Sequence, residues 1–248
     1  MTRVAVIGNS HVGALKLAWR RFADSRADIT LRFFASFGDT YRKLRLDEHR
    51  HYGALDADRF AEDELDSLRQ LNRRLTINLR SFDVVVNVGA PAFQVHDLPT
   101  LVQRTDIDGL AEIGAPLLLS HACYEAFLAD LVAEALPGPE WRNWEETRLL
   151  MVPPPRYAEI ALPADDPEPA RQRAAKARLD ALLTQAMDGI GARYVPQPDE
   201  TLADNGLTQR RFNRGAVGAR VNRTRDDPTH MNEDYGALQW REILAHLS

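Results

Sequence analysis

The sequence predicts an α/β protein, built as a three-layer α/β/α sandwich with a central parallel sheet. Short runs of apolar and β-branched residues alternate with longer segments whose apolar residues recur every three or four positions, as expected of buried parallel strands and amphipathic helices. Such an alternation implies right-handed crossovers and helices on both faces of the sheet. A chain of 248 residues with 44% apolar residues suits one domain of this kind, so we expect residues 1–248 to form a single unit.

Three strands and two helices are predicted in the first ninety residues. The strands are the apolar runs at 4–7, 29–36 and 83–88, each ended by a glycine. The first helix spans 10–24, where apolar residues recur at helical spacing and Ser10 lies near the N-cap. A long second helix is expected at 56–80, with leucines on its inner face.

The second half of the chain continues the alternation. Strands are predicted at 148–152, which Pro153-Pro154-Pro155 ends, and at 193–195. Helices are predicted at 123–136, 169–190 and 235–247. The stretch 115–120 fits either a strand or the approach to the helix that follows it.

Composition excludes several classes of protein. A single cysteine, Cys123, rules out an internal disulfide and disfavours a cysteine-based zinc site. No apolar run approaches the ~18 residues that a membrane span needs. The first residues enter a strand-like run directly, so we expect no signal peptide. The net charge of −5 argues weakly against nucleic acid as a partner. We therefore expect a cytoplasmic protein that acts on a small molecule, and its oligomeric state stays open.

Four short polar or glycine-containing segments follow the predicted strands, at 8–11, 36–38, 89–91 and 153–155. The carboxyl ends of parallel strands meet at one edge of a sheet, and ligands of open α/β sheets bind there. We expect all four segments on one rim.

The segment Gly8–Gly13 fits neither a phosphate-binding loop, which needs Lys after its second glycine, nor the dinucleotide fingerprint. It also lacks the second glycine of the α/β-hydrolase elbow, since Val12 occupies that position.

Ser10 is nevertheless well placed for nucleophilic chemistry. A serine between a strand and a helix exposes its Oγ on the rim, and its own first-turn N–H can face a developing oxyanion. Taken alone, Ser10 is better explained as a helix N-cap. The segment before the last helix favours the nucleophile over the N-cap for Ser10. In this segment Asp227 precedes His230 by three residues, on a turn that contains Pro228. A carboxylate that holds Nδ1 of this histidine would direct Nε2 outward as a base. The alternative is a solvated turn.

Together, Gly8-Asn9-Ser10-His11 and Asp227-Pro228-Thr229-His230 resemble the first and last blocks of the SGNH (GDSL-like) hydrolase superfamily, in order and position over nearly the whole chain. The resemblance implies the flavodoxin-like SGNH hydrolase fold and a Ser10, Asp227, His230 triad. It also implies an oxyanion hole made by the N–H groups of Ser10 and Gly38. Asn9 stands where the first block has Asp.

The third block departs from the pattern Gly-x-Asn-Asp. Gly89 is present, but Pro91 stands at the oxyanion Asn position and Ala92 at the Asp position. Loss of one such side-chain donor costs ~10²–10³ in rate. Asn87 is a weak candidate to replace it. Pro91 and His96 are weak candidates for substrate contacts.

The resemblance implies a serine ester hydrolase that removes a small acyl group, acetyl by family habit, from an alcohol or a carbohydrate hydroxyl. It requires no metal and no organic cofactor. Two alternatives remain: an O-acyltransferase with the same triad, and a non-catalytic binding protein on the same fold. The arginine-rich run at 210–225 is a solvated loop or a contact for an anionic substrate.

Overall fold

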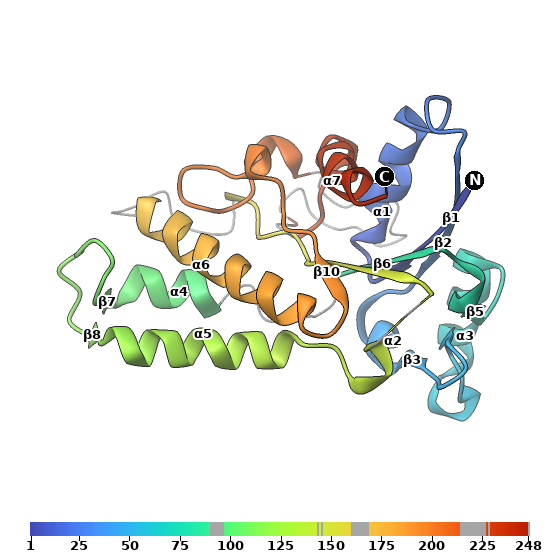
Figure 1. The fold of residues 1–248 in the computed structure, drawn as a ribbon, viewed down its shortest axis with the longest axis horizontal. Helices are drawn as coiled ribbons and strands as arrows, with labels where there is room; N and C mark the ends of the chain where they lie inside the picture. Colours follow the sequence, from blue (N-terminus) through green and yellow to red (C-terminus); the bar gives the residue numbers. More distant parts are fainter. Residues whose placement is uncertain are drawn as a thin grey trace.

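The computed structural model shows five parallel strands in the order β10-β9-β6-β1-β2, with helices on both faces (Figure 1). It describes residues 1–89, 97–142, 144, 146–159, 169–213, 227 and 229–247. The strands are β1 (Thr2–Gly8), β2 (Ile29–Ala35), β6 (Val84–Val88), β9 (Arg148–Val152) and β10 (Ala192–Tyr194). The predicted three-layer α/β/α class with a central parallel sheet is confirmed.

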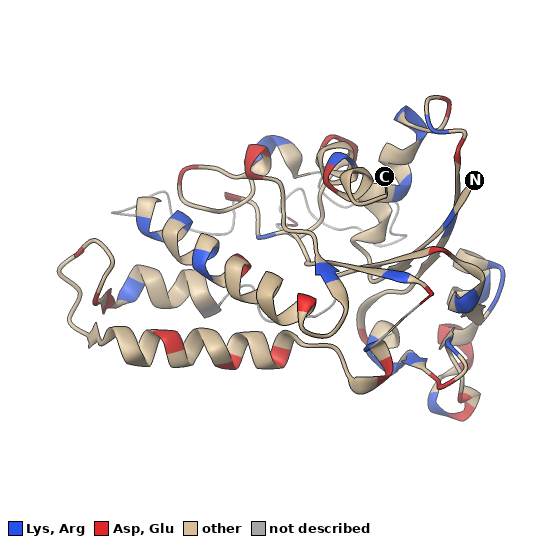
Figure 2. Cartoon of the chain, in the orientation of Figure 1, with Lys and Arg blue, Asp and Glu red and all other residues tan. Residues whose placement is uncertain are grey.

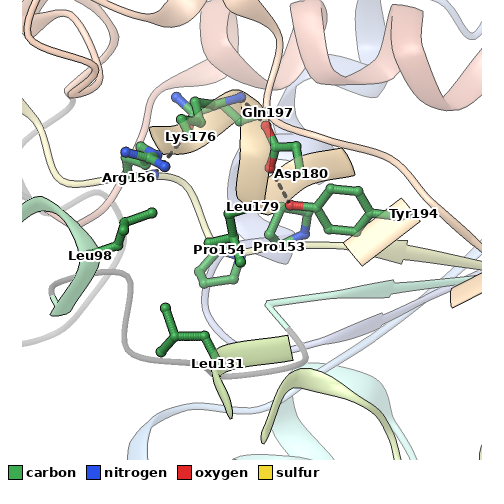
Figure 3. Close-up of a pocket in the computed structure, with 10 residues that line it drawn as sticks. All are labelled: Leu98, Leu131, Pro153, Pro154, Arg156, Lys176, Leu179, Asp180, Tyr194 and Gln197. Carbon is green, nitrogen blue, oxygen red and sulfur yellow. Dashed lines mark hydrogen bonds and ion pairs between the residues drawn. The ribbon is translucent and has the colours of Figure 1, made fainter. Parts of the chain in front are cut away.

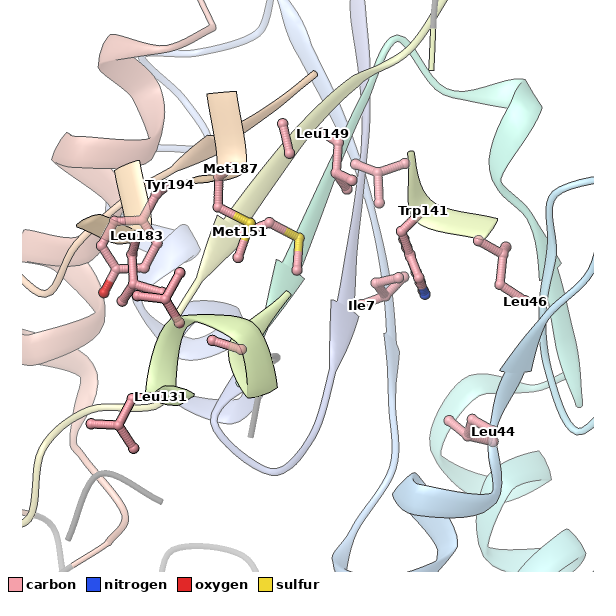
Figure 4. Packing of buried hydrophobic residues seen from close by; sticks show 14 of the residues in the cluster. Ile7, Leu44, Leu46, Leu131, Trp141, Leu149, Met151, Leu183, Met187 and Tyr194 are labelled. Carbon is pink, nitrogen blue, oxygen red and sulfur yellow. The ribbon is translucent and has the colours of Figure 1, made fainter. Parts of the chain in front are cut away.

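Alternate strand residues point to opposite faces of the sheet, and each face has its own core. Val4 and Val6 of β1 pack with the layer formed by α1 (Val12–Ala18) and α7 (Glu233–Ala245). Ala5 and Ile7 join the larger core on the other face (Figure 4). The helices of that layer are α3 (Glu62–Asn72), α4 (Asp97–Arg104), α5 (His121–Ala135) and α6 (Pro169–Asp188).

The helices α1 and α7 lie against each other, although they come from opposite ends of the chain (Figure 1). A Cβ on Gly236 would lie 2.3 Å from the carbonyl oxygen of Ala14, so only glycine allows this approach. Trp240 Nε1 donates a hydrogen bond to the carbonyl oxygen of Leu15 at 2.8 Å. This contact fixes the segment before α7 relative to the segment before α1.

The predicted helix at 56–80 is wrong over much of its length. The helix α3 ends at Asn72, and the next residue, Arg73, has a left-handed φ of 59°. The chain then forms β5 (Thr76–Asn78), which pairs antiparallel with β4 (His51–Gly53), and β4 pairs with β3 (Arg45–Leu46). The β-branched residues at 76 and 77 favour a strand. The leucines around them are spaced three or four residues apart, and this spacing led to the prediction of a helix.

The first helix is also shorter than predicted, and Ser10 does not cap it. The N-cap of α1 is His11, without a side-chain cap, and α1 gives way to the 3₁₀ turn Trp19–Arg21. The ambiguous stretch at 115–120 contains both elements, because β8 (Leu118–Leu119) pairs with β7 (Asp106–Ile107) and Ser120 then caps α5. Further 3₁₀ turns are Ala57–Arg59, Leu79–Ser81, Pro139–Trp141, Asp199–Thr201 and Arg210–Phe212.

The strand ends lie level at one rim. Gly8 pairs with Ala35 and with Val88, and Val88 pairs with Val152. The segments that begin at residues 8, 36, 89 and 153 therefore leave the sheet at the same edge, while Pro91 and its neighbours lie outside the described residues. The helix α2 (Gly38–Lys43) starts at this rim. Within the described ranges, no helix combines the length and hydropathy needed to cross a bilayer.

Candidate active site

Ser10 is held at the rim by contacts of its neighbours with the end of β6. Gly8 has a φ of 147°, and a Cβ there would lie 2.0 Å from the carbonyl oxygen of Val88. The side chain of Asn9 donates to the carbonyl oxygen of Gly89 at 3.3 Å and accepts from the N–H of His11 at 3.1 Å. The chain thus turns sharply between β1 and α1, and Ser10 lies on that turn.

The structure brings Ser10, His230 and Asp227 together. Ser10 Oγ lies 2.8 Å from His230 Nε2, and His230 Nδ1 lies 2.6 Å from Asp227 Oδ2. The Asp227 side chain is 10% exposed and that of His230 is 23% exposed. The carboxylate is therefore largely shielded from water, whereas the imidazole remains open enough to meet a substrate.

Thr229 binds the carboxylate of Asp227, a role that the sequence analysis did not predict. Its N–H donates to Asp227 Oδ1 at 3.0 Å, and its hydroxyl donates to the same oxygen at 2.6 Å. The hydroxyl oxygen also lies 3.0 Å from His230 Nδ1. Since Oδ1 is occupied by Thr229, Oδ2 is left to accept from the imidazole, which fixes the orientation of the ring.

These bonds keep Asp227 ionised. Burial alone would raise the pKa of its carboxyl group. The hydrogen bonds from Thr229 and His230 outweigh the burial and hold the pKa of Asp227 well below its usual range. A carboxylate that stays charged can hold the Nδ1–H tautomer of His230, which leaves Nε2 free of a proton and able to accept one from Ser10.

His11 lies beside this histidine and was also missed. Its ring centroid is 5.7 Å from that of His230. Burial, followed by the nearness of His230, lowers the pKa of His11 to about 3. His11 is therefore neutral near pH 7 and places no second positive charge beside His230.

The turn that carries Asp227 and His230 is tied to the body of the protein. Asn232 caps α7 by accepting from the N–H groups of Asp234 and Tyr235, and its side chain donates to the carbonyl oxygen of Arg211 at 2.7 Å. The Asn213 side chain donates to the carbonyl oxygen of Asp227.

The arginine-rich run at 210–225 is described only in its first part. Arg210 and Arg211 belong to a 3₁₀ turn beside the site, and the other arginines of the run lie outside the described residues.

The predicted oxyanion donors occupy the same rim. Gly38 opens α2 with a φ of 48°, and neither its N–H nor that of Ser10 donates to any residue in the described part of the chain. Asn87 is buried beneath the rim, and its Oδ1 has no hydrogen-bond partner. It faces a cavity of about 210 Å³ lined by Tyr41, Tyr52 and other residues on the α2 side of the sheet. Pro91 and His96 lie outside the described residues.

Among the described residues, no three His, Cys, Asp or Glu side chains lie close enough together to hold a metal ion.

No protein-family model and no curated protein matches the chain. Solved structures do resemble it. They include a proposed platelet activating factor from Streptococcus pneumonia (10% identity, TM-score 0.44, covering 99% of this chain and 83% of that chain). A DUF4886 family protein from Bacteroides uniformis is 14% identical, with a TM-score of 0.39 and the same coverage. A carbohydrate acetylesterase family member from Sinorhizobium meliloti is 15% identical, with a TM-score of 0.38, covering 100% of this chain and 97% of that chain.

Proposed function

We propose that the protein is a serine ester hydrolase that works through an acyl-enzyme. One observation carries the proposal: an unbroken chain of short contacts runs from Ser10 Oγ through the His230 ring to Asp227. A hydroxyl, an imidazole and a carboxylate in this order make up an activated nucleophile, and the hydroxyl lies on the rim where ligands of such sheets bind.

In the first half of the reaction, Ser10 Oγ attacks the ester carbonyl carbon while His230 Nε2 takes the hydroxyl proton. The carbonyl oxygen becomes an oxyanion, and we assign the N–H groups of Ser10 and Gly38 to it, because both are unused within the described chain. When the tetrahedral intermediate collapses, His230 gives its proton to the departing alcohol. The acyl group stays on Ser10.

In the second half, His230 takes a proton from water as the water oxygen attacks the acyl carbon. Collapse of this intermediate returns the proton to Ser10 Oγ and releases the acid. Asp227 stays ionised in both halves and stabilises the imidazolium that forms twice. The acyl group proposed is small, acetyl in the first instance, on an alcohol or a carbohydrate hydroxyl, as the resemblance of the sequence blocks implies.

Hydrolysis of p-nitrophenyl acetate tests the proposal. We expect wild-type turnover above background and loss to background in both Ser10→Ala and His230→Ala, because removing one member of such a unit costs about as much as removing all. Addition of a sugar acceptor, with mass spectrometry of the products, separates hydrolysis from transfer to a hydroxyl. Full activity of Ser10→Ala would refute the proposed nucleophile.

A further inference from the structure

Acidic and basic residues are both spread along the helices (Figure 2), and few charged side chains of the described structure are buried. Pairs such as Arg178 and Glu125 on neighbouring helices are exposed to water, and such pairs contribute little to stability. Three cations of the described chain are buried. Arg171 pairs with Asp106, whereas Arg156, 7% exposed, and Lys176, 6% exposed, lie together elsewhere. A buried charge needs a partner, because its transfer from water costs several kcal/mol.

Both cations line one small pocket beyond the carboxyl end of β9 (Figure 3). Its floor includes Pro153 and Pro154, which directly follow the strand, and Leu179 lines it from α6. The backbone of Arg156 is fixed on both sides: its N–H donates to Gln197 Oε1 at 2.8 Å and its carbonyl oxygen accepts from the Thr208 hydroxyl at 2.6 Å. The guanidinium is thus held at the pocket by a rigid backbone.

The charge of Asp180 acts on the Arg156 guanidinium, but no described carboxylate forms an ion pair with it, and its buried Nη1 has no hydrogen-bond partner. The carboxylate in the pocket is that of Asp180, which Lys176 and the Tyr194 hydroxyl already engage. Lys176 also lies 3.8 Å from Asp199, but that side chain is 95% exposed and solvent screens it. The described lining of the pocket therefore has two buried cations and one partly buried carboxylate, an excess of one positive charge.

The small size of the pocket favours a small anion. About 30 Å³ is open to the centre of a water-sized group. One water molecule needs ~10–15 Å³ on this measure, so the space holds two or three non-hydrogen atoms. A carboxylate has three and presents two oxygens to an arginine fork, whereas a phosphate group is larger.

The pocket and Ser10 share the rim. Two strand spacings separate β9 from β1, about 10 Å. Burial and then the charge of Asp227 raise the pKa of the hydroxyl of Tyr157, the residue that follows Arg156 in the chain. The pocket and the proposed nucleophile therefore lie beyond the carboxyl ends of two strands of the same sheet.

We propose that the pocket of Arg156 and Lys176 is a carboxylate-binding subsite. The carboxylate is either part of the ester substrate or a free small acid. The first source rests on the proposed esterase function, whereas binding of a carboxylate does not.

Thermal unfolding in sodium formate, compared with sodium chloride at equal ionic strength, tests the site without any catalysis. We expect formate to raise the unfolding midpoint of the wild type and of Ser10→Ala, because a ligand that binds the folded state stabilises it. The shift should disappear in Arg156→Met and shrink in Arg156→Lys, which keeps the charge but loses the fork. Arg178→Met, which removes an exposed arginine from the same helix as Lys176, is the matched control and should keep the full shift.

A second measurement distinguishes the two sources. If the substrate supplies the carboxylate, kcat/KM for 4-(4-acetoxyphenyl)butanoate should exceed that for its methyl ester by about 10- to 100-fold, the worth of a charge-assisted hydrogen bond, and Arg156→Met should abolish the preference. Equal rates together with a formate shift would assign the site to a free acid. Absence of a formate shift in the wild type, or an undiminished shift in Arg156→Met, would overturn the proposal, even if Ser10 proves to be catalytic.

Discussion

The rings of His11 and His230 lie with their centroids 5.7 Å apart and their planes tilted by 32°. His11 directly follows Ser10 in the chain, so the nucleophile and a second imidazole approach His230 together. Burial and the nearness of His230 lower the pKa of His11 from 6.5 to about 3. The neighbour of the proposed base is thus a neutral ring throughout the physiological range.

This pairing makes a prediction about stability and pH. Between pH 6.5 and about 3, the unfolded chain binds a proton at His11 that the folded protein does not bind. The free energy of unfolding should therefore fall on acidification through this window, by up to ~1.4 kcal/mol per pH unit from this group. His11→Gln should flatten the slope, as measured by urea unfolding at a series of pH values. An unchanged slope in His11→Gln would show that His11 protonates normally in the folded protein.

Asp227→Asn tests the role of the carboxylate. Thr229 would keep the amide oxygen at the Oδ1 position, so the amide NH₂ would face His230 Nδ1. That arrangement favours the tautomer with a proton on Nε2, which cannot accept the proton of Ser10. We expect kcat to fall by ~10³–10⁴ with the fold intact, as measured by p-nitrophenyl acetate hydrolysis and circular dichroism. A loss smaller than tenfold would mean that Asp227 does not hold the tautomer.

Thr229 is expected to act as a positioning residue. Thr229→Val removes the 2.6 Å hydroxyl bond to Asp227 and retains the backbone N–H. The pKa of Asp227 should rise and kcat should fall on the order of tenfold, the worth of one hydrogen bond to a charged group. Thr229→Ser restores the hydroxyl and should restore kcat. If Ser does not rescue activity, packing by the threonine methyl group is the cause, and the hydrogen bond is not.

The contact between α1 and α7 sets the distance between Ser10 and His230. In Gly236→Ala, the new Cβ would lie 2.3 Å from the Ala14 carbonyl oxygen, so the helices must separate. We expect a loss of ~1–3 kcal/mol in unfolding free energy and a fall of about 10² in kcat, the cost of a misplacement near 1 Å. Gly13→Ala on α1 is the control, since no atom lies within 4 Å of its new Cβ, and it should stabilise by ~0.5–1 kcal/mol. Equal activity of the two variants would contradict this account of the positioning.

Much of this arrangement could be predicted from sequence because its signals are local. The β-branched runs at 4–7 and 83–88 are typical of buried strands, and a glycine follows each. Asp227 and His230 are three residues apart, so their pairing needs only a turn. Ser10 could be predicted because it lies in the short segment between a strand and a helix, although α1 begins two residues after it.

The rest depends on contacts between distant segments or on backbone conformation. His11 is an ordinary polar residue in the sequence, and its low pKa arises only when the turn before α7 packs on it. Arg156 became notable only because α6 and β10 enclose it. The helix at 56–80 was predicted wrongly because nothing in the local pattern marks the left-handed turn at Arg73. Thr229 occupies an unspecified position in the pattern Asp-x-x-His, so nothing in the sequence indicated its hydrogen bonds to Asp227.

Covalent labelling of the nucleophile tests the central claim most directly. The wild type should react with a fluorophosphonate probe, and mass spectrometry of the digest should place one adduct on Ser10. Labelling should vanish in Ser10→Ala and slow markedly in His230→Ala, because the hydroxyl then has no base. A wild-type protein that is folded yet unlabelled, or an adduct that persists in Ser10→Ala, would contradict the assignment of Ser10 as an activated nucleophile.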